Sequence, residues 1–329
     1  MLRLRKVVPL ETKGRTSVAK LSVELGMSAA HERFYSRVLG LDQIATADGI
    51  PLGELLLEVG DEALAGVDRS TVRYLIHTHT MQHVAPSAAR LVGSLRDKLG
   101  LGDARAFSLA QQGCASGLYV LGVAEALLGE EAAGSRALVL IGDKASHTEG
   151  RLIPGATLLG DGAVGLLVAL DGPGDLVLAS SHRTLGEYHE SRNMSKADQK
   201  RYQSGYVPML REVMTEAVSR AGIAMDDVSM VLPHNVNRFS WIETGRQFGF
   251  PVERMYLDNV ARVGHCYGSD PFVNLVSARA EQRIGSIRCG SVAVVASTTR
   301  SAPSTASSRL TAADPRYPSR DACRTALSA

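Results

Sequence analysis

The sequence predicts a layered α/β fold, in which buried strands alternate with helices. Three continuous apolar runs, at residues 72–77, 137–142 and 162–168, are typical of strands covered on both faces. Helical apolar spacing occurs between them, over 86–99 and 118–128. With 329 residues, 45% hydrophobic content and 32 glycines, the chain is long enough to bury a large core and to form two fused halves.

In the first half, the strand over 72–77 ends at His77 and leads through a polar turn into the helix over 86–99, where Pro86 marks the first turn. The loosely alternating run 106–110 predicts a further strand. A glycine-rich turn connects this strand to the next helix, so a short elbow is expected there.

The second half repeats this order. We expect a helix over 207–221, a strand over 228–234, helices over 238–248 and 271–283, and a buried strand over 291–296. The strand over 228–234 ends in His234, as the strand of the first half ends in His77. Two similar halves are therefore predicted, although their sequences are too different to be called a repeat.

Three segments complete the predicted organisation. The halves span 1–170 and 171–300, and the polar residues 183–205 form an exposed loop between them. Residues 301–329 are rich in Ser, Thr, Ala, Pro and Arg without apolar periodicity, so we predict a disordered tail.

Composition narrows the function classes. The 36 basic and 34 acidic residues nearly balance, which disfavours nucleic acid or an anionic membrane as the main partner. Cys114, Cys266, Cys289 and Cys323 are far apart, which disfavours a zinc ribbon or a disulfide framework. The basic N-terminus lacks a signal-peptide core and no run approaches about 18 apolar residues. We therefore expect a cytoplasmic protein.

The segment 112–117, Gln-Gly-Cys-Ala-Ser-Gly, places Cys114 where a strand ends and an apolar helix begins. N–H groups at a helix start favour a thiolate, and the thiolate is the reactive form of cysteine. The position therefore suits covalent acyl chemistry. The alternative from this segment alone is that Cys114 is a small buried apolar residue.

Histidines offer a second candidate site. His77, His79 and His83 have spacing that could suit a metal, but no carboxylate or thiol is close to them in the sequence, so we expect no metal.

Four motifs in this order resemble the thiolase-like condensing enzymes, in particular the ketoacyl-acyl-carrier-protein synthase III branch. They are the elbow around Cys114, the segment 83–89, the Leu-Gly-Asp-Gly-Ala turn at 159–163, and Pro-His-Asn-x-Asn at 233–237, and the resemblance covers roughly residues 20–300. It implies a five-layered αβαβα fold of two pseudo-symmetric halves in a homodimer. It also implies that Cys114 accepts an acyl group from a coenzyme A or carrier-protein phosphopantetheine thioester, with no tightly bound cofactor.

The resemblance assigns His234 to the active site, where an imidazole suits proton transfer near neutral pH. At the third catalytic position, type III members usually carry asparagine. This chain instead has Gly264-His265 in a turn like the Gly-His-x-x-Gly of the type I and II enzymes, so His265 is the third predicted catalytic residue. Asp270 is close enough in sequence to orient His265.

Two further departures concern the ligands. The family has a glycine run after the last buried strand, whereas this chain reads Ala-Ser-Thr-Thr-Arg at 296–300, which departs from the pattern of enzymes that initiate ordinary fatty-acid synthesis. The only tryptophan is Trp241, far from where the family stacks adenine. Arg33 and Arg37 could contact a coenzyme A or carrier phosphate, although arginines on a helix are often only solvated.

Three functions remain open. The first is a ketosynthase that condenses acyl-Cys114 with a malonyl-type thioester by decarboxylation in specialised metabolism, with two neutral imidazole N–H groups stabilising the enolate. The second is an acyltransferase of the same fold that passes the acyl group to a hydroxyl or amine, with His234 as general base. The third is a catalytically silent partner subunit.

Overall fold

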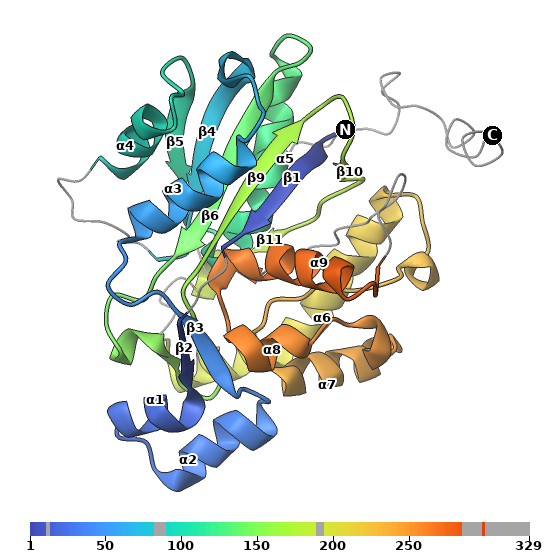
Figure 1. Ribbon diagram of the computed structural model, residues 1–329. Helices are drawn as coiled ribbons and strands as arrows, with labels where there is room; N and C mark the ends of the chain where they lie inside the picture. The colour runs from blue at the N-terminus through green and yellow to red at the C-terminus, as the bar shows by residue number, and fades with distance from the viewer. Residues whose placement is uncertain (11–13, 82–89, 189–193, 285–297, 300–329) are drawn as a thin grey trace.

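A six-stranded mixed sheet forms the centre of the computed structural model, which describes residues 1–10, 14–81, 90–188, 194–284 and 298–299 (Figure 1). Its strand order is β10 (Asp175–Leu176), β1 (Arg3–Pro9), β9 (Gly162–Ala169), β6 (Arg136–Asp143), β4 (Val72–Thr78) and β5 (Arg105–Leu109). β6, β4 and β5 run parallel, whereas β9 is antiparallel to both β6 and β1. The three parallel strands therefore end at the same edge of the sheet.

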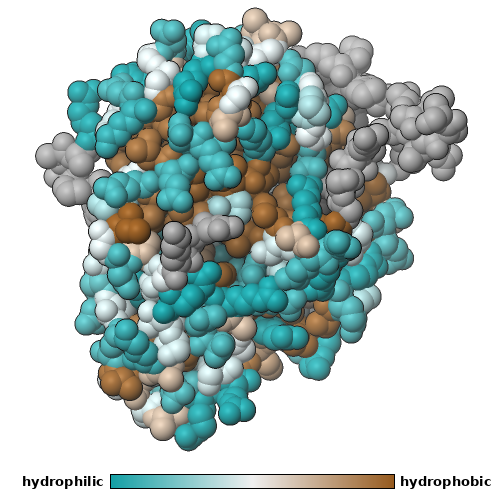
Figure 2. Space-filling model, in the orientation of Figure 1, coloured by the Kyte–Doolittle hydropathy of each residue, from teal (hydrophilic) through white to brown (hydrophobic). Residues whose placement is uncertain are grey.

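Helices cover both faces of this sheet. α3 (Leu52–Ala63) packs on one face and α5 (Ser116–Gly129) on the other. Alternate residues of β6 face the two helices, with Leu138 on the α3 side and Val139 on the α5 side. Figure 2 shows hydrophobic residues concentrated around α3 and the middle of this face. The continuous apolar runs are confirmed as strands buried on both faces.

The remaining elements surround the sheet. They are β2 (Gly14–Ser17), α1 (Val18–Glu24), α2 (Ala29–Arg33), β3 (Gln43–Thr46), α4 (Leu91–Lys98), β7 (Leu152–Ile153), β8 (Thr157–Leu158), β11 (Arg183–Thr184), α6 (Lys196–Arg220), α7 (Arg238–Phe248), α8 (Asp258–Val263), α9 (Asp270–Ala280) and β12 (Thr298–Thr299). Helices α6 to α9 come from the second half of the chain and lie together beyond the sheet (Figure 1). Within the described ranges, no helix has the length and apolar character needed to cross a membrane.

Two predictions about the second half are wrong. The predicted loop over 183–205 becomes helical from Lys196, because Ser195 caps α6 by accepting a hydrogen bond from the backbone N–H of Asp198. The predicted strand over 228–234 is only an isolated parallel bridge between Val231 and Met255.

The start of the helix predicted over 86–99 lies outside the described residues, and so do the whole strand predicted over 291–296 and the whole tail over 301–329. The sheet of the first half includes β10, beyond residue 170, and the division of the chain there stays a prediction.

Candidate active site

Cys114 lies on a single helical turn, Gly113–Ala115, between β5 and α5. Gly113 has a φ of 51°, a left-handed conformation that glycine adopts without strain. At Gly117, in the first turn of α5, a Cβ would clash with the carbonyl oxygen of Gly268. The lack of a side chain at Gly117 therefore lets the cysteine elbow pack directly against the turn that follows His265.

The Leu-Gly-Asp-Gly-Ala motif and Leu158, the residue before it, hold His265 in place. The His265 N–H donates to Leu158 O at 3.1 Å, and the Gly160 N–H donates to His265 O at 3.0 Å. A Cβ at Gly160 would clash with the carbonyl oxygen of Val263, and one at Gly162 would clash with Cys266. The two glycines of the motif thus allow the histidine-bearing segment to approach the sheet.

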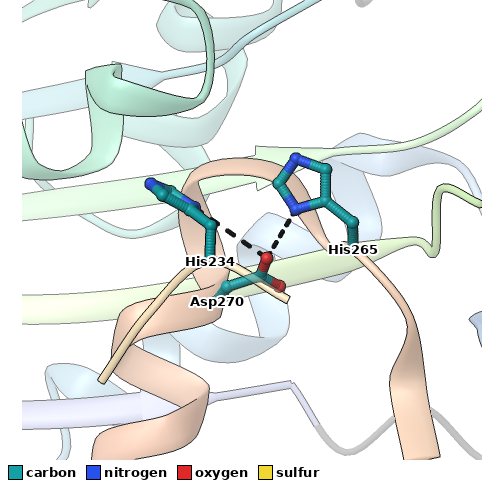
Figure 3. Close-up of side chains that lie close together, drawn as sticks. All are labelled: His234, His265 and Asp270. Carbon is teal, nitrogen blue, oxygen red and sulfur yellow. Dashed lines mark hydrogen bonds and ion pairs between the residues drawn. The ribbon is translucent and has the colours of Figure 1, made fainter. Parts of the chain in front are cut away.

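The Cys114 thiol contacts the ring of His265, with 3.1 Å between Sγ and Nε2. The other ring nitrogen, Nδ1, donates to Oδ2 of Asp270 at 2.5 Å (Figure 3). Burial alone would lower the pKa of His265, but the negative charges of Cys114 and Asp270 and the hydrogen bonds to both raise it to about 10. His265 therefore carries a proton at neutral pH and presents it to the sulfur of Cys114, the atom placed to act as a nucleophile.

Asp270 is fixed by the backbone on both sides. Its Oδ2 accepts from the Asn235 N–H at 2.7 Å, and its Oδ1 accepts from the Cys266 N–H at 2.7 Å and from the Asn235 amide at 3.2 Å. Asp270 is fully buried, so these hydrogen bonds and His265 compensate its charge. The first asparagine of Pro-His-Asn-x-Asn therefore serves to orient the carboxylate that orients His265.

His234 lies on the other side of Asp270, with its ring 5.7 Å from that of His265 and its Nδ1 3.9 Å from Asp270 Oδ2 (Figure 3). Its Nδ1 lies 3.0 Å from the carbonyl oxygen of Tyr267, which can only accept a hydrogen bond. Burial lowers the pKa of His234 to about 4, although Asp270 opposes this shift. At neutral pH, His234 is therefore neutral with its proton on Nδ1, and Nε2 carries a lone pair.

The sequence analysis expected both histidines to be neutral and to donate a ring N–H to the enolate. The tautomer of His234 differs from this expectation. Nε2 of His234 is buried and has no hydrogen-bond partner among the described residues. It can accept a proton, but in the neutral ring it cannot donate one. The signal that decides this, the Tyr267 carbonyl, is a backbone group that no sequence motif reveals.

His234, His265 and Asp270 also place three potential metal-ligand atoms within 4.8 Å of one another. However, the 2.5 Å separation between His265 Nδ1 and Asp270 Oδ2 is that of a hydrogen bond, and Asn235 donates to the same oxygen. These donors suit proton transfer better than metal binding, and the absence of a metal stays a prediction.

The other predicted site residues are not among the group formed by Cys114, His234, His265 and Asp270. His77 and His79 stack with their ring centroids 4.9 Å apart, and each ring contacts a backbone carbonyl. His83 and the rest of the motif over 83–89 lie outside the described residues. Arg33 and Arg37 are exposed, and neither forms an ion pair with the described part of the chain, so their contact with a phosphate stays a prediction.

Comparison with known proteins finds similarity over most of the chain. The family model for the C-terminal part of 3-oxoacyl-[acyl-carrier-protein] synthase III matches residues 218–297, which include both histidines. The β-ketoacyl-[acyl-carrier-protein] synthase III of Rhizorhabdus wittichii is 26% identical over 260 residues, which cover 73% of this chain and 79% of that protein. The enzyme of the same name from Rhodobacter capsulatus is 27% identical over 274 residues, which cover 75% and 80%.

Solved structures show the same fold. The acyltransferase ChlB3 superposes with a TM-score of 0.75 at 20% identity, covering 86% of this chain and 90% of its own. The 3-oxoacyl-(acyl carrier protein) synthase III of Pseudomonas aeruginosa superposes with a TM-score of 0.69 at 21% identity, with the same coverage. The fold is thus the thiolase-like fold that the four motifs imply. In sequence the chain is thus similar to β-ketoacyl-[acyl-carrier-protein] synthase III enzymes, and in fold it is similar to their solved structures.

Proposed function

We propose that the protein transfers an acyl group from a coenzyme A or carrier-protein thioester to Cys114 and condenses it with a malonyl-type thioester. The observation that carries this proposal is the continuous contact from Cys114 Sγ through His265 to Asp270, at 3.1 and 2.5 Å. Such a chain generates a thiolate without an external base. No tightly bound cofactor is needed, since the thioester itself is the substrate.

In the first step, the Cys114 thiolate attacks the thioester carbonyl, and the donor thiolate leaves and takes a proton from solvent. Acylation removes the negative charge that held the His265 proton, so its Nε2–H becomes free to face the second substrate. Asp270 still compensates the charge of the imidazolium. His265 can therefore supply the donor that the asparagine supplies in type III members.

In the second step, the malonyl group loses carbon dioxide, and the resulting enolate oxygen accepts a hydrogen bond from His265 Nε2. The enolate carbon attacks the acyl-Cys114 carbonyl, the bond to sulfur breaks, and a β-ketoacyl thioester leaves. The Cys114 thiolate and the His265 imidazolium are thereby restored. A fixed cation beside developing negative charge is the principal stabilising element of this step.

A second candidate, acyl transfer to a hydroxyl or amine, is favoured by one specific observation. The Tyr267 carbonyl leaves the lone pair of His234 on Nε2, which suits a general base for the acceptor. ChlB3, which shares the fold, is described as an acyltransferase. Both candidates use the same acyl-Cys114 intermediate and differ only in what attacks it.

The two candidates are separated by incubating isolated acyl-enzyme with a malonyl thioester. Condensation predicts carbon dioxide and a β-ketoacyl thioester in equal amounts. Release of an ester or amide from an added alcohol or amine, without carbon dioxide, would replace condensation by simple acyl transfer. The third possibility, a catalytically silent subunit, is tested first by intact-protein mass spectrometry after exposure to acyl thioesters. An acyl adduct that Cys114→Ala abolishes would rule it out.

The assembly is proposed to be a cytoplasmic homodimer of the kind that the resemblance implies. β5 lies at one edge of the sheet and leads directly into the cysteine elbow. An edge strand can pair with the same strand of a second copy. Light scattering coupled to size-exclusion chromatography would test this, and a mass of one chain at micromolar concentration would contradict it.

A further inference from the structure

Asn274 is a fully buried amide on α9, one helical turn after Asp270. It stands within the apolar run Pro-Phe-Val-Asn-Leu-Val at 271–276. Burying an amide is costly unless its polar atoms are hydrogen-bonded, and an apolar residue would avoid this cost. The presence of an amide at this position therefore indicates a specific role.

The Asn274 amide contacts the residues on both sides of His234. Its Nδ2 donates to the carbonyl oxygen of Pro233 at 2.7 Å and to Oδ1 of Asn235 at 3.0 Å. Residues one turn apart lie on the same face of a helix, so Asp270 and Asn274 both meet the segment that carries His234. Asn274 thus holds the backbone before His234 and the side chain after it.

The direction of the hydrogen bonds around Asn274 is unambiguous. A carbonyl oxygen can only accept, so the amide nitrogen of Asn274 must face Pro233. A carboxylate can only accept as well, so the amide nitrogen of Asn235 must face Asp270. Oδ1 of Asn274 accepts from Nδ2 of Asn259 on α8 at 2.9 Å. Each amide in this buried chain therefore donates toward Asp270, and a satisfied chain of this kind favours a single arrangement of its members.

His265 and Asp270 are held largely by other hydrogen bonds. The backbone of His265 pairs with the segment 158–160. Asp270 accepts from two backbone N–H groups at 2.7 Å, and only its longer bond, at 3.2 Å, comes from an amide of the buried chain. Removal of the Asn274 amide is therefore expected to disturb His234 more than His265.

We infer that Asn274 is a positioning residue for His234, which holds the imidazole where its Nε2 can accept a proton from a hydroxyl or amine substrate. The inference rests on the proposed acyl-enzyme chemistry in its form with such an acceptor. The two hydrogen bonds to the residues that flank His234 can be tested without this chemistry. A displacement of about 1 Å, caused by a substitution away from the reacting atoms, can slow a step about 100-fold.

The first experiment follows His234 in the full-length protein without any substrate. Burial lowers the pKa of His234 to about 4, and NMR of isotope-labelled histidines measures it, with His234→Gln identifying the signals. In Asn274→Ala, we expect the ring to move toward water and its pKa to rise toward about 6.5, the value of an exposed histidine. The signals of His265 should change little. Asn274→Thr, which keeps the side-chain volume but lacks the two N–H donors, is the second variant and should act in the same direction.

The second experiment separates the two chemical steps. Single-turnover measurements compare the loading of Cys114 by acetyl-CoA with the consumption of the acyl-enzyme by ethanolamine, which offers both a hydroxyl and an amine. We expect Asn274→Ala to slow consumption about tenfold or more and to slow loading much less.

Asn259→Ala is the matched control. It removes another buried amide of the same chain, which donates to Asn274 and to Oγ of Ser277 at 2.9 and 3.0 Å. Both donors of Asn274 stay in place on the residues that flank His234. This variant should leave the titration of His234 and the consumption rate unchanged, and thermal unfolding of all variants shows how much stability each one loses.

An unchanged pKa of His234 in folded Asn274→Ala protein would overturn the inference and leave the proposed function intact. Equal slowing of loading and consumption, or equal effects of Asn274→Ala and Asn259→Ala, would also overturn it, since each would show a role in stability alone. Absence of any acyl adduct at Cys114 would count against the proposed function, and the titration of His234 would then decide whether Asn274 positions the ring.

Discussion

At the scale of single residues, the site separates two histidines that look alike in the sequence. Both rings are buried near Asp270, yet the pKa of His265 is raised to about 10 and that of His234 is lowered to about 4. His265 contacts the negative charges of Cys114 and Asp270, whereas His234 contacts a neutral carbonyl. The difference in neighbours suits His265 to carry a proton beside the sulfur of Cys114 and His234 to accept one.

Asp270→Asn should slow alkylation of Cys114 by iodoacetamide at pH 7 about tenfold, because loss of the carboxylate lowers the pKa of His265 and weakens the thiolate pair. Alkylation kinetics measured by mass spectrometry check this. Asp258→Asn is the control, since Asp258 pairs with Arg283 at the surface of α8. An unchanged rate in folded Asp270→Asn protein would contradict the role of Asp270.

With a hydroxyl or amine as second substrate, His234→Gln should slow consumption of the acyl-enzyme about 100-fold or more, the usual contribution of a general base. Consumption by a malonyl thioester, in which His265 stabilises the enolate, should slow much less. Loading of Cys114 should change much less, since His265 supports that step. Single-turnover experiments separate the two rates. The exposed His31 on α2 provides a control substitution to Gln. An equal loss in both steps would show that His234 acts on structure and not on the second step.

At the scale of elements, the active site depends on how closely α5 approaches the turn that follows His265. This distance is set by Gly117, which faces the carbonyl of Gly268 with no room for a side chain. Gly160 and Gly162 play the same part on the other side of His265. The catalytic contact is thus produced by backbone packing between elements that are about 150 residues apart in the chain.

Gly117→Ala should destabilise the protein by about 1–3 kcal/mol and slow Cys114 alkylation, because the added methyl group pushes α5 away from the histidine turn. Gly129→Ala, at the end of the same helix, is the matched control, since a Cβ there meets no atom within 4 Å. That control should be neutral or slightly stabilising. Denaturant unfolding and alkylation rates measure both effects, and similar behaviour of the two variants would refute the packing argument.

At the scale of the whole molecule, the first half supplies the nucleophile and the second half supplies both histidines and their carboxylate. Neither half holds a complete site, so activity requires the two to be packed together. This packing buries several titratable groups, and each contributes to stability in its own pH range.

The protein should be most stable near pH 6.5. Below this pH, unfolding lets His77 and His234 take up protons, because burial lowers their pKa values to about 3 and 4. Asp143 offsets one of these two protons. Burial raises its pKa to about 7, so its carboxyl group is protonated in the folded protein and loses that proton on unfolding. The net loss is about 1.4 kcal/mol per pH unit between pH 6.5 and 5.

Above pH 6.5, the raised pKa of His265 has the opposite effect. The stabilisation of the folded protein by protonated His265 is fully present below pH 6.5, the pKa of this histidine in the unfolded chain. It is lost as the pH rises toward about 10, the pKa in the folded protein. Thermal unfolding at constant ionic strength from pH 5 to 9 checks both limbs. Asp143→Asn should steepen the acid limb about twofold, and a Tm that rises from pH 6.5 to 5 would contradict the assignment.

The sequence by itself determined the strands and the helix around the cysteine elbow and indicated which side chains meet there, whereas α1 to α3, β2 and β3 were not predicted. Apolar periodicity is a local signal, so it predicted β4, β6, β9 and α5 to within a few residues. The Gly-His turn indicated His265 and suggested Asp270 as its partner. By contrast, β1 was missed in the basic N-terminus, because its place between β9 and β10 depends on distant strands.

Only the tertiary structure decided what each histidine can do. The proton position on His234 depends on the carbonyl of Tyr267, and the charge of His265 depends on Cys114 from the other half of the chain. Protonation follows from electrostatic neighbours in space, and residue spacing does not encode them.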